Sequence, residues 1–138
     1  MSNVFLDTNV LLYLMSADES KADRAEQLML GGGLGSRVVS VQILNEFANV
    51  AMRKLDMSLP EIREVLQTVR IMCSVEAVTV ETHDSGLDLS ERYGFAIYDS
   101  MMLASALLAD CSVVYTEDLQ NGQNIEGTLA VNNPFAES

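Results

Sequence analysis

Short runs of apolar and β-branched residues recur along the chain and predict β-strands. They fall at residues 3–7, 37–40, 75–80 and 112–116, with a weaker run at 129–132. Each run is brief and rich in β-branched residues, which is typical of strands covered on both faces. The pattern therefore predicts a sheet of four to five strands.

Apolar residues at helical spacing fill the segments between these runs. They predict helices at 21–30, 41–55, 59–72, 83–93 and 99–110, and a further helix led by Thr8 and Asn9. Ser58 and Glu61 have the spacing of a capping box before the helix at 59–72. Because strands alternate with helices, we expect an α/β fold in which helices cover a central, mainly parallel sheet.

Length and composition favour one folded domain over residues 1–138. Apolar residues make up 49% of the chain and charged residues 20%, which excludes a disordered chain. We expect neither a membrane span nor a secretory signal, because no apolar run approaches about 18 residues and the first residues lack a basic region. Cys73 and Cys111 have no metal or disulfide spacing, so we expect small buried residues in a reducing cytoplasm.

The net charge of the chain limits the kinds of ligand that it can bind. Twenty acidic residues against eight basic ones give a net charge of −12. This charge argues against strong non-specific nucleic-acid binding, and it permits a cation-binding acidic site or a cationic partner; simple solubility is the alternative.

The glycine-rich stretch at 31–35 lies between a helix and a strand. A phosphate-binding loop has the opposite order, so we expect a helix stop and a turn here.

Four acidic residues lie near strand ends or helix starts. Asp7 closes the first strand, Glu46 lies in the helix after the second, Asp99 opens the helix at 99–110, and Asp118 follows the strand at 112–116. Parallel strands end at one edge of a sheet, so these carboxylates would converge, and Mg²⁺ or Mn²⁺ would relieve their repulsion. Each acid taken singly also has an ordinary structural interpretation. Asp99 would be a helix N-cap, Asp118 a turn residue and Glu46 a solvated side chain.

One helix carries a polar stripe, and the chain has a single histidine. Gln42, Glu46, Asn49 and Arg53 lie on one face of the helix at 41–55.

We expect His83 to be a structural or surface residue. We expect no Ser-His-Asp triad around this single histidine, and a metal site would be carboxylate-based.

Four segments resemble, in order, the motifs of the PIN-domain family. They are VFLDTNVLLY at 4–13, NEF at 45–47, YDSMMLASA at 98–106 and YTEDLQNG at 115–122; the ending VNNPF at 131–135 is also similar. The resemblance spans nearly the whole chain. It implies a three-layer α/β/α fold and a Mg²⁺- or Mn²⁺-dependent endoribonuclease, most often the VapC-type toxin of a toxin–antitoxin pair.

The resemblance also implies roles for particular residues. The catalytic and metal-binding acids would be Asp7, Glu46, Asp99 and Asp118, and the residues that hydrogen-bond to ligands or substrate would be Thr8, Asn9 and Thr116. Three of the acids (Asp7, Asp99 and Asp118) would hold a first metal. Glu46 would serve a second metal or position the attacking water. Hydrolysis would leave 5′-phosphate and 3′-hydroxyl ends.

Two further positions bear on this resemblance. Tyr98 fits the aromatic residue that precedes the family's third acid. Gln120 stands where the family has a further acid, which leaves open whether the site binds one metal or two.

The predicted partners are RNA, an antitoxin protein and a second copy of the chain. An antitoxin Arg or Lys would be attracted to an acidic site. Met15, Met52, Met57 and Met72 lie on or beside predicted helices that could expose them, and methionines suit surfaces that repack against partners. Filling of the core is the other interpretation of these methionines.

Two other function classes are open at this point. Asp7-Thr8-Asn9 at a strand end is similar to the nucleophile motif of haloacid-dehalogenase-like phosphatases, but that motif requires an Asp where this chain has Asn9. The second is a non-catalytic PIN-like module that only binds a partner. Retention of all four acids argues against such a module.

Overall fold

The computed structural model describes residues 2–31 and 35–136, which contain one six-stranded sheet. The strands are β1 (Asn3–Leu6), β2 (Arg37–Ser40), β3 (Ser74–Glu76), β4 (Cys111–Tyr115), β5 (Asn124–Ile125) and β6 (Leu129–Asn132). Their order across the sheet is β3-β2-β1-β4-β6-β5. All neighbouring pairs are parallel except β5 and β6. The predicted mainly parallel sheet is confirmed, with one strand more than expected.

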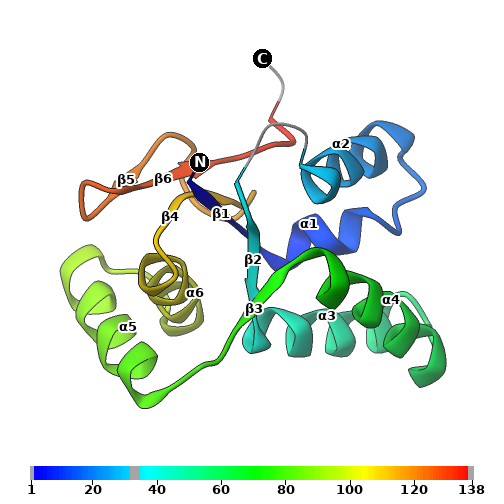
Figure 1. The fold of residues 1–138 in the computed structure, drawn as a ribbon, viewed down its shortest axis with the longest axis horizontal. Helices are drawn as coiled ribbons and strands as arrows, with labels where there is room; N and C mark the ends of the chain where they lie inside the picture. The colour runs from blue at the N-terminus through cyan, green and yellow to red at the C-terminus, as the bar shows by residue number, and fades with distance from the viewer. Residues whose placement is uncertain (1, 32–34, 137–138) are drawn as a thin grey trace.

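Six helices in the described chain cover the two faces of the sheet. They are α1 (Thr8–Tyr13), α2 (Glu19–Leu30), α3 (Val41–Lys54), α4 (Leu59–Met72), α5 (Val80–Tyr93) and α6 (Ile97–Leu108). Helices α1 to α4 lie on one side of the sheet, and α5 and α6 lie on the other (Figure 1). This arrangement confirms the three-layer α/β/α fold. None of the described helices has the length and apolar character needed to span a membrane.

The third and fifth strands differ from the sequence prediction. The strand predicted at 75–80 ends at Glu76, because Thr79 caps α5: the Thr79 hydroxyl accepts from the Thr82 amide in a capping box. The short β5 was not predicted. It forms a hairpin with β6 through Glu126 and Gly127, which both have positive φ (56° and 75°). Both central residues of such a tight turn need positive φ, and Glu is an uncommon choice for it.

Buried apolar side chains from the sheet and both helical layers form the core. Phe5 of β1, Phe47 of α3 and Leu103 of α6 are completely buried. Cys73 and Cys111 are buried free thiols as predicted, and burial raises their pKa values to about 11 and about 12.

Two further predictions also hold. His83 is exposed on α5. Gly31 ends α2 in the left-handed conformation, as predicted for a helix stop. The rest of that prediction includes residues 32–34, which lie outside the described residues.

The capping box predicted at the start of α4 is present. The Ser58 hydroxyl accepts from the Glu61 amide at 3.3 Å, and the Glu61 carboxylate accepts from the Ser58 amide at 2.9 Å. We expect Ser58→Ala to lower the free energy of unfolding by about 1 kcal/mol and Ser58→Gly by only a few tenths. Urea denaturation measures both changes. Equal losses in the two variants would contradict the capping role.

The order of the strands fixes where a site can form. β1 lies between β2 and β4 and is parallel to both, so all three strands end at the same edge of the sheet. The chain leaves β1 toward β2 on one side and returns to β4 on the other. Ligands of α/β proteins bind at such a reversal point. Asp7 follows β1 directly and therefore lies at its centre.

Candidate active site

Asp7 is a buried carboxylate held by three hydrogen-bond donors. It is the N-cap of α1, and Oδ1 accepts from the Thr8 amide at 2.6 Å. Oδ2 accepts from the Thr116 hydroxyl at 2.7 Å and from Asn9 Nδ2 at 3.4 Å. The side chain therefore has one fixed orientation at the end of β1.

Asn9 connects Asp7 to Asp118. Its Nδ2 also donates to Asp118 Oδ2 at 3.2 Å, and the Asp118 amide donates to the Thr116 hydroxyl at 3.1 Å. The chain after β4 is thereby joined to the start of α1. Asn9 Oδ1 is buried and has no hydrogen-bond partner in the described residues. A buried carbonyl oxygen without a partner is costly, so this atom is available to a ligand or to a water.

Glu46 is held from both sides on α3. The Thr8 hydroxyl donates to Oε2 at 2.8 Å, and Gln42 Nε2 donates to Oε1 at 3.0 Å. Gln42 Nε2 also donates to the backbone carbonyl of Tyr98 at 3.1 Å. Gln42 thus connects α3 to the first turn of α6, beside Asp99. The sequence placed Gln42 on the polar stripe but did not indicate this contact.

Asp99 does not open its helix, and its interpretation as an N-cap is wrong. Ala96 is the N-cap of α6, without a side-chain capping bond, and Asp99 is the third residue of the helix. In the described part of the chain its carboxylate makes no hydrogen bond. Burial raises the pKa of Asp99, and the negative charges of Asp118 and Glu46 raise it further.

The neighbouring negative charges also affect the carboxylate of Asp7. Burial raises the pKa of Asp7 from 3.8 to about 6, although hydrogen bonds from Thr116 and Thr8 oppose the increase. The charges of Asp118 and Glu46 add to it. The structure therefore brings the four predicted acids into one electrostatically coupled group, with Asp7 buried, Asp118 exposed and the other two half-buried.

This raised pKa predicts a specific pH dependence of stability in EDTA. The folded protein retains a proton on Asp7 between about pH 4 and pH 6, whereas the unfolded chain has lost it, so Asp7 lowers stability progressively as pH rises through this interval. Relative to Asp7→Asn, the wild type should lose on the order of 2–3 kcal/mol between pH 4 and pH 7. Urea denaturation of both proteins across this range tests it. A constant difference would contradict the raised pKa.

The chemistry of the donor set fits Mg²⁺ or Mn²⁺. Carboxylate oxygens and a free amide carbonyl are the ligands that these ions prefer. In the described residues, no group of three or more His, Cys, Asp or Glu side chains is arranged to hold a metal ion. Mg²⁺ usually retains several waters and is bound by one or two carboxylates together with substrate phosphates. The acids therefore suit a partly hydrated ion rather than a closed cage.

A contact that the sequence did not indicate fixes the loop before Asp118. The Tyr13 hydroxyl donates to the Glu117 carboxylate at 2.7 Å, and Lys21 Nζ lies 4.6 Å from the centre of the Tyr13 ring. These residues come from α1, α2 and the loop after β4. Only the tertiary fold brings them together, so no local pattern could have revealed the contact.

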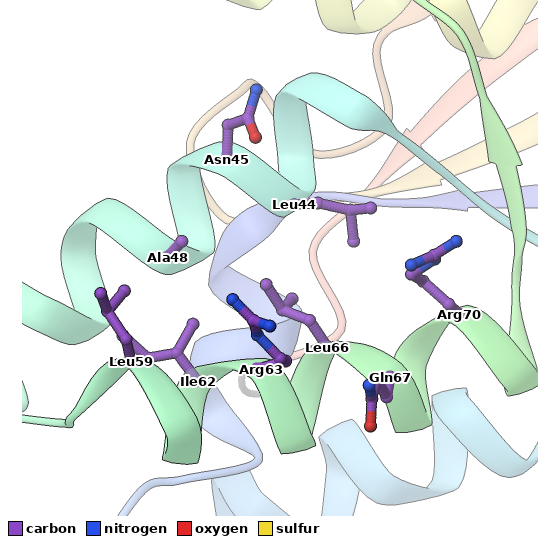
Figure 2. A pocket seen from close by; sticks show the side chains of 9 residues that line it. All are labelled: Leu44, Asn45, Ala48, Leu59, Ile62, Arg63, Leu66, Gln67 and Arg70. Atoms are coloured by element: carbon purple, nitrogen blue, oxygen red, sulfur yellow. The ribbon is translucent and has the colours of Figure 1, made fainter.

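A hollow of about 490 Å³ lies between α3 and α4. Figure 2 shows Leu44, Ile62 and Leu66 in the space between the two helices, with Arg63 and Arg70 along α4. Asn45 lines this hollow and also a second hollow next to Glu46. The two hollows therefore lie on adjoining faces of α3.

The family model described as PIN domain matches residues 4–120. This match covers most of the chain and includes Asp7, Glu46, Asp99 and Asp118. The chain therefore belongs to the PIN-domain family, as its motifs predicted. No curated protein matches the chain in a sequence search.

Solved structures share the whole fold. A toxin–antitoxin complex from Klebsiella pneumoniae is 17% identical, with a TM-score of 0.72 over 96% of this chain and 98% of the other. VapBC2 from Rickettsia felis, bound to a DNA fragment from its promoter, is 14% identical, with a TM-score of 0.67 over 95% and 99%. Mycobacterium tuberculosis VapC20, described as a sarcin–ricin loop cleaving toxin, is 17% identical, with a TM-score of 0.63 over 83% and 89%. The family and these likenesses leave the phosphatase alternative without support.

Proposed function

We propose that this chain is a Mg²⁺- or Mn²⁺-dependent endoribonuclease, the VapC-type toxin of a toxin–antitoxin pair. The observation that carries the proposal is the coupled group of Asp7, Glu46, Asp99 and Asp118 at the carboxyl ends of β1 and β4. Membership of the PIN-domain family supports the same chemistry.

In this proposal each side chain has a defined task. Asp7, Asp99 and Asp118 would hold the cation. Once bound, the cation would lower the pKa of a water molecule and stabilise the charge that develops on the phosphate. Thr8 and Thr116 hold the Asp7 carboxylate in one orientation.

Glu46 and Asn9 would complete the site. Glu46, fixed by Thr8 and Gln42, would orient the attacking water and accept its proton. Asn9 would keep Asp118 beside Asp7. Attack of the water oxygen on phosphorus would break the bond to the 3′-oxygen, which would take a proton from solvent, leaving a 5′-phosphate and a 3′-hydroxyl.

RNA is the proposed substrate. VapC20, which shares the fold, is described as a sarcin–ricin loop cleaving toxin. The net charge of −12 means that a phosphodiester cannot approach the bare acids without a neutralising cation. Action on RNA would place the protein in the cytoplasm.

The proposed reaction is tested with purified protein and unstructured RNA oligonucleotides. Fragments should form with Mn²⁺ or Mg²⁺ and should not form in EDTA, and ligation chemistry specific for 5′-phosphates should capture them. Cleavage that persists in EDTA, or fragments that end in 2′,3′-cyclic phosphate, would contradict the proposed mechanism.

We also propose that the protein forms a homodimer and binds an antitoxin that inserts a basic side chain into the acidic site. Similar folds in toxin–antitoxin complexes support such a partner. The excess negative charge favours a basic side chain. Met15 and Met52 are 43% and 45% exposed and available to partners, whereas Met57 and Met72 pack partly against the core.

Light scattering at micromolar concentration tests both contacts. We expect the mass of two chains for the protein alone and a larger complex after the product of a small neighbouring gene is added. The antitoxin should also inhibit RNA cleavage. A species with the mass of one chain that does not change on adding the partner would contradict both contacts.

A further inference from the structure

A hollow of about 500 Å³ adjoins the acidic site on the outer face of α3. It is lined by Val41, Gln42, Asn45, Glu46, Asn49, Val78 and Tyr98. Glu46 belongs to both places: Oε2 accepts from Thr8 beside Asp7, and Oε1 accepts from Gln42 in the wall of the hollow. A molecule in the hollow would therefore lie next to any group bound at the acids.

Tyr98 supplies an exposed aromatic surface to this hollow. The side chain is 72% exposed in the first turn of α6, and its hydroxyl has no hydrogen-bond partner in the part of the chain that the structure describes. Gln42 holds the backbone carbonyl of Tyr98 at 3.1 Å, which fixes the start of the helix. Exposed aromatic rings near a catalytic site are suited to stacking on a planar ligand.

Two free amides supply hydrogen-bonding groups to the same hollow. Asn45 and Asn49 are exposed one turn apart on α3, and neither side chain is hydrogen-bonded in the described residues. An amide offers both a donor and an acceptor, which matches the edge of a nucleobase. An aromatic face beside amide groups is the combination that binds unstacked bases of single-stranded RNA.

The charge of the hollow selects a base rather than a phosphate. No lysine or arginine lines it, and Glu46 contributes the single charged side chain of the lining. A phosphate would be repelled by Glu46 and by the neighbouring acids, whereas a base is uncharged. Arg53 is exposed on the same polar stripe, one turn beyond Asn49, where it can contact the backbone of a longer strand.

We propose that this hollow binds one unpaired nucleobase next to the cleaved phosphodiester, with the base stacked on Tyr98 and its edge hydrogen-bonded by Asn45 and Asn49. The inference rests on the proposed ribonuclease function and specifies its substrate as single-stranded RNA read at one base. Tyr98 sets affinity through stacking, and the two amides set base preference. Paired bases cannot enter, because their edges and faces are already occupied.

Binding of short RNA carrying 2-aminopurine tests the proposal independently of cleavage. Hexanucleotides with the fluorescent base at successive positions are mixed with protein and Mg²⁺ and read by stopped flow before cleavage accumulates. The wild type should quench one position most strongly. Tyr98→Ala should bind about ten- to a hundredfold more weakly without that quenching, since stacking dominates such contacts.

Three further variants make the test specific. Tyr98→Phe should behave as the wild type, because the ring and not the hydroxyl stacks. Ile71→Ala, at a residue 85% exposed on α4, is the matched surface control and should bind normally. The double variant Asn45→Ala/Asn49→Ala should keep the quenching but reduce the preference among homopolymeric A, C and U hexanucleotides. Thermal melts check that every variant is folded.

The outcomes separate this inference from the ribonuclease proposal. Quenching that depends on Tyr98 without any RNA cleavage supports the base-binding hollow and contradicts hydrolysis. If the wild type cleaves RNA and Tyr98→Ala binds RNA as tightly as the wild type, hydrolysis is supported and base binding in the hollow is overturned. If no hexanucleotide binds to the wild type, base binding in the hollow is also overturned.

Discussion

Asp7→Asn and Asp99→Asn should each lower the rate of RNA cleavage by about a hundredfold or more. Both substitutions keep the shape of the side chain and remove a negative charge from the acidic site, where a cation would be held against the substrate. Loss of one preorganised electrostatic contact costs a factor of about 10²–10³ in catalysis. Initial rates at saturating Mn²⁺ give the comparison.

Controls distinguish lost chemistry from lost structure. Asp88→Asn removes an exposed carboxylate from α5, which lies beside Leu107 and Leu108 at the end of α6 far from Asp99, and should cut RNA at the wild-type rate. Asp7→Asn should also be more stable than the wild type in EDTA near neutral pH, because the buried charge of Asp7 is gone. Full activity in both Asp7→Asn and Asp99→Asn would show that the site is wrongly assigned.

Mn²⁺ should raise the melting temperature of the wild type. The four acids repel one another in the folded protein, and a cation that binds only this state relieves the repulsion. At about 100 times its dissociation constant, such a ligand adds about 2.7 kcal/mol to the free energy of unfolding. Thermal melts in EDTA and in millimolar Mn²⁺ measure the gain.

Asp99→Asn and Asp88→Asn extend the same measurement. The gain should disappear in Asp99→Asn and remain complete in Asp88→Asn, because a specific site needs the acid on α6 whereas general screening of a −12 chain does not. Equal stabilisation of all three proteins would indicate screening only.

Much of the fold could be predicted because the local patterns agree with the tertiary structure. β1, β2 and β4 are short runs that are largely buried in the sheet, and α3 buries Ile43, Phe47 and Ala51 along one face. The acids could be found for the same reason. Residues that follow parallel strands lie at one edge of the sheet. The positions of Asp7 and Asp118 just after two predicted strands therefore predicted that they would be close in space.

The features that escaped prediction depend on contacts between distant segments. β5 has two residues and exists because the turn at Glu126 and Gly127 folds it onto β6. The position of Asp99 within α6 depends on a helix that begins at Ile97 without a side-chain cap. The double contact of Gln42 with Glu46 and with Tyr98 joins residues 56 positions apart. Periodicity cannot report any of these contacts.

If the four acids form a cation site required for catalysis, calorimetric titration will detect binding of Mn²⁺ to it. The wild type and Asp88→Asn should show saturable binding with the same stoichiometry, and Asp99→Asn should show at least a tenfold loss of affinity. A wild type that takes up no Mn²⁺ would contradict the cation site and would leave a PIN-domain protein that binds partners without cutting RNA.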